Sequence, residues 1–186
     1  MPFSDLTRRA LNHALAELSL SLSPSAMDSI LKAYNNLSTF PGTSALLQSL
    51  RQHADKVYPV IFTNGTNDMV STSISESPDL GPHAAIFKDV ITVEEVGKFK
   101  PSPDVYYHLA EKVGKERDPE GIKEIWLISG NPFDVVGAKA MGMKAVWVDR
   151  AGSGWVDRLV EGSRGSPDIV VRSLDEVVGK VLGASR

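Results

Sequence analysis

The first forty residues contain two stretches in which apolar residues recur at helical spacing. Six residues share one face of the first stretch, which comes after a capping residue type at Ser4: Leu6, Ala10, Leu11, Ala14, Leu15 and Leu18. A second helix is predicted from Ser23-Pro24, and its apolar face consists of Met27, Ile30, Leu31 and Tyr34. Asn35-Asn36 and then Phe40-Pro41-Gly42 interrupt the pattern. Residues 1–40 are therefore expected to form a helical segment distinct from the rest of the chain.

From residue 41 onward, short apolar runs alternate with helical periods. The runs predict strands at Val57–Phe62, Ile86–Thr92, Ile125–Ile128, Ala145–Val148 and Ile169–Val171. Helices are expected around Leu46–Leu50, after Asn67, and at Asp104–Val113, Phe133–Met141 and Leu174–Leu182. Strands that are apolar nearly throughout are typical of sheets covered on both faces. The pattern predicts an α/β fold with a mostly parallel sheet and helices on both faces.

Charge and composition narrow the classes of partner. The chain of 186 residues has 20 Lys and Arg against 23 Asp and Glu, a net charge of -3, and no cysteine. The charge balance argues against nucleic acid or an anionic membrane as a partner. The absence of cysteine excludes a disulfide, a thiolate nucleophile and a cysteine-bound metal. No apolar run approaches the roughly 20 residues that cross a bilayer. We expect a cytoplasmic protein.

Polar residues come directly after two of the predicted strands. Val57–Phe62 leads into Thr63-Asn64-Gly65, and Ile125–Ile128 leads into residues 129–134. The carboxyl ends of parallel strands are where ligands bind in such sheets, and a helix N-terminus there favours an anion. The alternative is that these residues only make caps and turns, which Asn, Gly, Ser and Asp do in most proteins.

Four segments together are more specific than either loop. In chain order they are Thr63-Asn64-Gly65, Lys100-Pro101-Ser102-Pro103-Asp104, Ser129-Gly130-Asn131-Pro132-Phe133-Asp134 and Trp147-Val148-Asp149-Arg150. This series resembles the haloacid dehalogenase superfamily, and most closely its L-2-haloacid dehalogenase branch. The resemblance implies a Rossmann-like core over residues 41–186. It also implies that residues 1–40 are a remnant of the helical cap, including the ending Ala33-Tyr34-Asn35-Asn36-Leu37.

The same resemblance assigns roles to residues. It implies that Lys100 stabilises negative charge on the nucleophile, and that Asn131 and Asp134 position this lysine and the catalytic water. The substrate-binding residues would be Thr63, Asn64, Gly65 and Ser129. Alternatively, Lys100 is a surface lysine and Asp134 only caps the helix that begins at Phe133. The dehalogenase branch uses no metal, so we expect no metal and no cofactor.

One motif of the family does not occur in these residues. Family members carry the nucleophile in an Asp-x-x-Gly-Thr motif on the first strand, and no aspartate of this chain stands in that pattern. In the family that strand lies between the strands that here end at Thr63 and Ser129. We therefore expect that those two strands pair directly, or that another segment or a second subunit fills the gap, and we expect a homodimer.

Three functions are compatible with the sequence. The first, which we favour here, is a recruited non-hydrolytic enzyme: a cyclase, isomerase, lyase or pericyclase of the Diels–Alder type. It would position an apolar organic substrate and donate hydrogen bonds to its carbonyl or carboxylate. The second is a truncated (S)-2-haloacid dehalogenase, whose full-length form cleaves carbon–halide bonds. The third is a non-catalytic binding or assembly protein. Retention of Lys100, Asn131 and Asp134 together favours the first function over the third.

Overall fold

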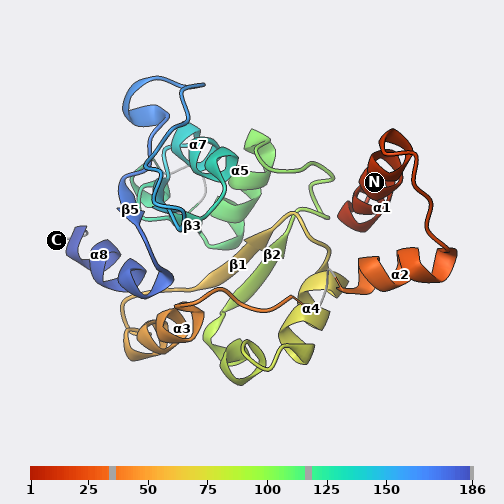
Figure 1. Cartoon of the computed structure of the whole chain (residues 1–186). Coiled ribbons are helices and arrows are strands. Elements are labelled where there is room, and N and C mark those ends of the chain that lie inside the picture. Colours follow the sequence, from red (N-terminus) through yellow and green to blue (C-terminus); the bar gives the residue numbers. More distant parts are fainter. Residues whose placement is uncertain (34–36, 116–118, 185–186) are drawn as a thin grey trace. The chain divides into compact units, whose positions relative to one another are not determined.

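The computed structural model describes residues 1–33, 37–115 and 119–184 (Figure 1). These residues form two compact units, each built from two stretches of the chain. The first unit comprises Met1–Thr39 and Pro59–Gly97, and the second comprises Phe40–Tyr58 and Lys98–Arg186. The predicted boundary at residue 40 between a cap remnant and a core stays a prediction.

The first unit contains two parallel strands and several helices. Its elements are α1 (Phe3–Glu17), α2 (Pro24–Ala33), β1 (Val60–Thr63), α4 (Asn67–Glu76), the 3-10 helix η1 (Gly81–Ile86) and β2 (Asp89–Thr92). The strands pair in register, with Val60 opposite Asp89 and Thr63 opposite Thr92. The first strand begins later than predicted, at Val60, because Pro59 has no N–H for the ladder.

The two predicted helix starts in this unit have different outcomes. The predicted start at Ser23-Pro24 is confirmed, because α2 begins at Pro24 and the N–H of Ala26 donates to the Ser23 hydroxyl at 3.2 Å. The predicted cap at Ser4 is wrong, because α1 already begins at Phe3 and no side chain caps it. Tyr34, Asn35 and Asn36 lie outside the described residues.

The second unit contains a three-stranded parallel sheet in the order β3-β4-β5. Its strands are β3 (Trp126–Ser129), β4 (Lys144–Val148) and β5 (Ile169–Val171). Its helices are α3 (Thr43–Gln52), α5 (Pro103–Lys112), α6 (Pro119–Ile122), α7 (Pro132–Ala140), η2 (Gly162–Arg164), η3 (Leu174–Glu176) and α8 (Val177–Ala184).

Strand β4 is covered on both faces. On one face Val146 and Val148 pack with Val177 of α8, and Leu46 of α3 lies against this cluster. The other face presents Ala145 and Trp147, which pack with Val135 of α7 and with Trp155. The side chains of β4 therefore alternate between two apolar layers. The predicted α/β class with parallel strands and helices on both faces is confirmed.

The two strands expected to flank the family's first strand lie in different units. Among the described residues, β1 pairs with β2 in the first unit, and β3 pairs with β4 in the second. Direct pairing of β1 with β3 stays a prediction, because the two strands belong to different units. Filling of these edges by a second subunit stays a prediction.

Candidate functional site

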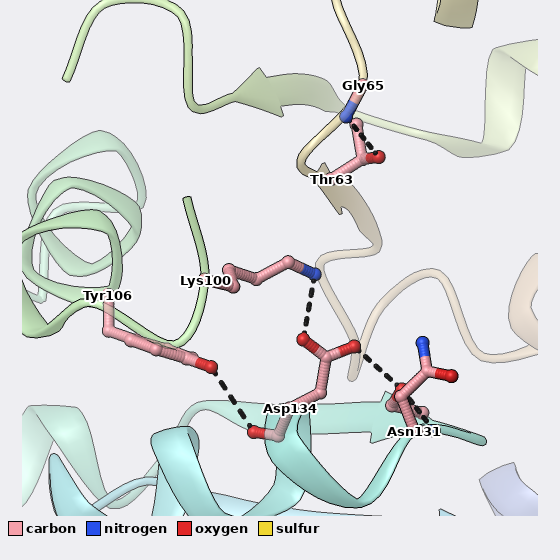
Figure 2. A network of polar contacts seen from close by, with 7 residues as sticks. Thr63, Gly65, Lys100, Tyr106, Asn131 and Asp134 are labelled. Atoms are coloured by element: carbon pink, nitrogen blue, oxygen red, sulfur yellow. Dashed lines mark hydrogen bonds and ion pairs between the residues drawn. The ribbon is translucent and has the colours of Figure 1, made fainter. Parts of the chain in front are cut away.

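A buried ion pair links the segment before α5 to the first turn of α7. The Lys100 Nζ atom lies 3.1 Å from Oδ1 of Asp134, and the two side chains are only 7% and 6% exposed (Figure 2). The predicted alternative of a surface lysine is therefore wrong. Two opposite charges in a poorly solvated place hold each other in fixed positions, since neither is solvated by water instead. The result is an ammonium group at a defined position beside the end of β3.

The hydroxyl of Ser129 fixes the other oxygen of this carboxylate. Ser129 donates to Oδ2 of Asp134 at 2.8 Å and accepts the backbone N–H of Asn131 at 3.0 Å. A serine hydroxyl has one hydrogen, and Asp134 accepts it here. The predicted role of Ser129 as a donor to substrate would require that this bond be exchanged.

The helix α7 begins one residue earlier than expected. Its N-cap position is Asn131, and Pro132 is the first helical residue. Asp134 is therefore inside the first turn and is not the cap, which corrects the alternative interpretation of that residue. A carboxylate in the first turn is favoured by the helix dipole, and this one also holds Lys100.

Tyr106 belongs to the same cluster and was missed by the sequence analysis. It is fully buried, and its hydroxyl donates to the backbone oxygen of Asp134 at 3.4 Å. Burial, and secondly the charge of Asp134, raises the pKa of Tyr106 well above its ordinary value, so the phenol stays protonated. The one signal in the sequence was a tyrosine on the apolar face of the helix that comes after Lys100.

Glycine at position 137 is required by this tyrosine. A Cβ atom there would lie 2.1 Å from the Tyr106 hydroxyl and 2.6 Å from Cζ of its ring. The tyrosine thus occupies the space that a side chain on α7 would fill, and it packs α5 directly onto the α7 backbone. This contact holds Lys100 and Asp134 on two adjacent elements.

The predicted residues of the first loop lie in the first unit. The Gly65 N–H donates to Oγ1 of Thr63 at 3.0 Å (Figure 2), and Asn64 between them is half-buried. The hydroxyl of Thr66 caps α4 by accepting the N–H of Met69. The structure thus brings together Lys100, Ser129, Asn131 and Asp134 in one unit and places Thr63, Asn64 and Gly65 in the other.

The anion expected at the start of α4 is a side chain of the protein itself. The Asn67 N–H donates to Oε2 of Glu94 at 2.7 Å. A carboxylate at this end satisfies a backbone donor that has no partner within the helix. Sequence reasoning missed Glu94, because it lies after β2 and only the pairing of β1 with β2 brings it here.

A second carboxylate, Asp149, lies after β4 and is also held by the backbone. It accepts the N–H groups of Gly152 and Ser153 at Oδ1 and that of Gly154 at Oδ2, at 2.9 to 3.1 Å. Burial raises the pKa of Asp149, but these three bonds and the charge of Arg172 outweigh burial and lower it overall. This carboxylate stays ionised and shapes the loop after β4.

The described residues contain neither a metal-binding cluster nor a membrane-spanning helix. No three His, Asp or Glu side chains in the described ranges are grouped so that they could hold a metal ion. No helix in the described part of the chain is long and apolar enough to cross a membrane. The predictions of no cofactor and of a cytoplasmic location stay predictions.

Comparison with known proteins identifies the family. The sequence model of the family described as haloacid dehalogenase-like hydrolase matches residues 7–148. This match covers well over half of the chain. The chain therefore belongs to the haloacid dehalogenase-like hydrolase family, and the predicted resemblance is confirmed.

Individual relatives narrow the branch. Haloacetate dehalogenase H-2 of Moraxella sp. (strain B) is 28% identical over 176 residues, which are 95% of this chain and 71% of that protein. The (S)-2-haloacid dehalogenase of Xanthobacter autotrophicus is 30% identical over 148 residues, which are 80% of this chain but 53% of that protein. The chain thus spans from about half to 71% of the length of these relatives.

Solved structures agree. The L-2-haloacid dehalogenase from Xanthobacter autotrophicus, solved with chloropropionic acid covalently bound, superposes with a TM-score of 0.76 at 28% identity. That match covers 98% of this chain and 77% of the solved chain. Another L-2-haloacid dehalogenase has a TM-score of 0.83 at 24% identity over 98% of this chain and 73% of its own, and shows the fold alone.

Proposed function

We propose that this chain carries the lysine side of a 2-haloacid dehalogenase site, and that the protein hydrolyses the carbon–halogen bond of short 2-halo acids. The observation that carries the proposal is the buried Lys100–Asp134 pair, held by Ser129 at the carboxyl end of β3. Its support is the similarity to relatives named as haloacid dehalogenases. This ranks the hydrolytic alternative above the recruited enzyme that the sequence alone favoured.

The reaction has two steps. A carboxylate displaces halide from C2 of the substrate and forms an ester, and water then cleaves the ester and restores the carboxylate. The proposed role of Lys100 is to stabilise the negative charge of the carboxylate before attack and of the oxyanion during hydrolysis. Asp134 fixes the position of Lys100, and Ser129 fixes that of Asp134.

The nucleophile is the part that these 186 residues do not supply in the family's pattern, since they contain no Asp-x-x-Gly-Thr sequence. The proposal therefore assigns it to a longer form of the protein. Halide release from 2-chloropropionate should be measured with the 186-residue chain and with a form that has a family-like N-terminal segment added. Release by the longer form alone supports the proposal, and no release by either folded form overturns it.

A matched pair of variants ties release to the site. In the longer form, Lys100→Gln should abolish halide release. Lys123→Gln removes the same charge from an exposed lysine, which in the described ranges pairs with Glu120 at 2.6 Å, and should leave release unchanged. Equal activity of both variants would remove Lys100 from the mechanism.

A second function is favoured by one specific observation. The cation and its carboxylate partner are complete within one unit, whereas the chain lacks the nucleophile motif. A donor of this kind suits a non-hydrolytic cyclase, isomerase or lyase that polarises a carbonyl. This function would be selected by two results together: neither form releases halide, and a carbonyl substrate is converted in a reaction that requires Lys100. Binding without conversion would select the non-catalytic protein.

The partners are also part of the proposal. We assign a small organic acid as substrate and a second copy of the chain as the protein partner. For the 186-residue chain, the support is that no described strand of the second unit pairs with the second edge of β3, because unpaired strand edges favour pairing with another chain. The molar mass of the chain in solution, measured by light scattering during gel filtration, tests the dimer. A mass near the 20.1 kDa of one chain would contradict it.

A further inference from the structure

The loop 63–66 joins β1 to α4 and contains Thr63, Asn64 and Gly65, which the family resemblance assigns to substrate binding. Thr63 is the last residue of β1 and Asn67 is the first residue of α4, so residues 64–66 alone lie between them. The loop is closely packed, because Gly65 is buried and its N–H donates to Oγ1 of Thr63 at 3.0 Å (Figure 2). The position of so short a loop is set by the groups that hold its two ends.

Strand pairing fixes the first end of this loop. Thr63 lies opposite Thr92 in the parallel pair of β1 with β2. Thr92 is itself buried, with 5% of its surface exposed, so it belongs to the packed interior of the first unit. The β1 end of the loop is therefore anchored to β2.

Glu94 fixes the second end of the loop. It follows β2, which ends at Thr92, and its Oε2 atom accepts the N–H of Asn67 at 2.7 Å. The other side chain that caps α4 is that of Thr66, which belongs to the loop and moves with it. Glu94 instead belongs to the segment that continues β2. Both ends of the loop are thus held by the same strand and its continuation.

We propose that Glu94 is a positioning residue for substrate binding by the loop 63–66. By holding the N–H of Asn67, it fixes the start of α4 and thereby the places at which Asn64 and Gly65 meet the substrate. The inference rests on the proposed function, which supplies the acid that the loop binds. The role requires no contact between Glu94 and that acid.

The direction of the change in KM separates positioning from charge. In the longer form, Glu94→Ala should raise the KM for 2-chloropropionate by about threefold or more and leave kcat within about twofold, because the loop binds the ground state and the transition state alike. Loss of the negative charge alone would lower the KM, since a carboxylate near the loop repels an acid. An unchanged or lower KM would overturn the proposal.

Glu94→Gln tests whether the hydrogen bond carries the effect. The amide oxygen of glutamine accepts an N–H without a negative charge, so the KM of this variant should lie within about twofold of the wild-type value. A rise as large as that in Glu94→Ala would show that the bond to Asn67 is not responsible and would overturn the proposal.

Glu176→Ala is the matched control. Glu176 also accepts backbone N–H groups, those of Arg172 and Ser173 at 2.9 and 3.1 Å, but it lies in the second unit. This variant loses a cap as Glu94→Ala does, and its KM should stay within about twofold of the wild-type value. An equal rise in KM for both variants would mean a general loss of stability and would overturn the proposal.

Glu94→Asp covers the case in which Glu94→Ala does not fold. It keeps the charge and shortens the side chain by one methylene, so the carboxylate no longer reaches the N–H of Asn67 at the same distance. The KM should then rise by at least about twofold, because a hydrogen bond weakens steeply outside its preferred geometry. A wild-type KM in this variant would overturn the proposal.

Hydrogen exchange of the Gly65 amide, followed by NMR on the 186-residue chain, tests the positioning without any reaction. The amide should exchange about threefold or more faster in Glu94→Ala than in Glu94→Gln, since the loop opens more often once its second end is released. Equal exchange rates in the two variants would overturn the inference.

The two measurements distinguish failure of the inference from failure of the proposed function. If the longer form releases halide and Glu94→Ala leaves its KM unchanged, the inference fails and the function stands. If no form releases halide but exchange at Gly65 depends on Glu94, the positioning stands without the function.

Discussion

Lys100 and Asp134 form an ion pair of 3.1 Å in which both side chains are more than nine-tenths buried. The two oxygens of the carboxylate have different partners, because Oδ1 faces the lysine and Oδ2 accepts the hydrogen of Ser129. The aspartate is thus the centre of the network, since it contacts both Lys100 and Ser129. This division makes separate predictions for each residue.

Breaking the pair from one side should be costly. Lys100→Met leaves a buried carboxylate without its cation, so the free energy of unfolding should fall by about 3 kcal/mol or more. Asp134→Leu should have a similar effect because it leaves a buried ammonium. Urea unfolding followed by circular dichroism measures both.

The double variant Lys100→Met/Asp134→Leu provides the control. Replacing both charges by apolar groups removes the unpaired charge, so the double variant should lose much less than the sum of the two single losses. Additive losses would show that the two charges do not interact.

The close approach of Tyr106 to α7 gives a second prediction. Gly137→Ala puts a Cβ atom 2.1 Å from the tyrosine hydroxyl, so it should lower the free energy of unfolding by about 1–3 kcal/mol. Adding Tyr106→Phe should restore only part of this loss, because the ring Cζ atom would still lie 2.6 Å away. Thermal melts of the single and double variants measure the difference.

Gly179→Ala is the matched control for that series. Gly179 lies in α8, and nothing is within 4 Å of its added Cβ. The same change there should raise the stability by roughly 0.5–1 kcal/mol, since alanine is the better helix former. If Gly137→Ala changed the free energy of unfolding no differently from Gly179→Ala, the packing of Tyr106 against Gly137 described above would be contradicted.

The order of strands and helices was predictable because apolar runs and helical periods are local signals. Ile169–Val171 was predicted with the bounds that the structure has, and the helix at Asp104–Val113 differs by one residue at each end. The strand predicted at Ile86–Thr92 is shorter, because Ile86 ends a 3-10 helix and pairing starts at Asp89.

The site was predictable only where a motif is continuous in sequence. Lys100 and Asp134 were identified from their motifs, but their contact depends on the packing of α5 against α7 through Tyr106 and Gly137. Glu94 was missed for the same reason, because a parallel strand pair brings it to α4. Contacts between distant segments arise from tertiary packing, which no local period encodes.

Ser129 gives a third prediction. Ser129→Ala removes both the donor to Asp134 and the acceptor for the N–H of Asn131. The variant should lose about 1–3 kcal/mol of stability, since one oxygen of a buried carboxylate loses its hydrogen bond. In the longer form its kcat for 2-chloropropionate should fall, because Asp134 then holds Lys100 less firmly.

Ser29→Ala is the control for the loss of a hydroxyl. Ser29 is exposed and donates to the backbone oxygen of Ser25 at 2.9 Å. The free energy of unfolding of this variant, measured in urea, should lie within about 0.5 kcal/mol of the wild-type value. Equal effects of the two serine changes would mean that the bond to Asp134 contributes nothing specific.

The loop after β4 gives a prediction about pH. Because its hydrogen bonds and Arg172 outweigh burial, the pKa of Asp149 is lower in the folded chain than its ordinary value of 3.8. A carboxyl group of this kind stabilises the fold above its unfolded pKa, and the contribution is lost as the pH falls through the lower folded pKa. Asp149→Asn should therefore lower the melting temperature most above about pH 5, and the difference should shrink below about pH 4.

Thermal melts from pH 7 to pH 2.5 measure this difference, with Asp5→Asn in α1 as the control for loss of one negative charge. A difference that stays constant across this range would show that the charge of Asp149 does not stabilise the loop, because stabilisation by the ionised carboxylate is lost once that group is protonated.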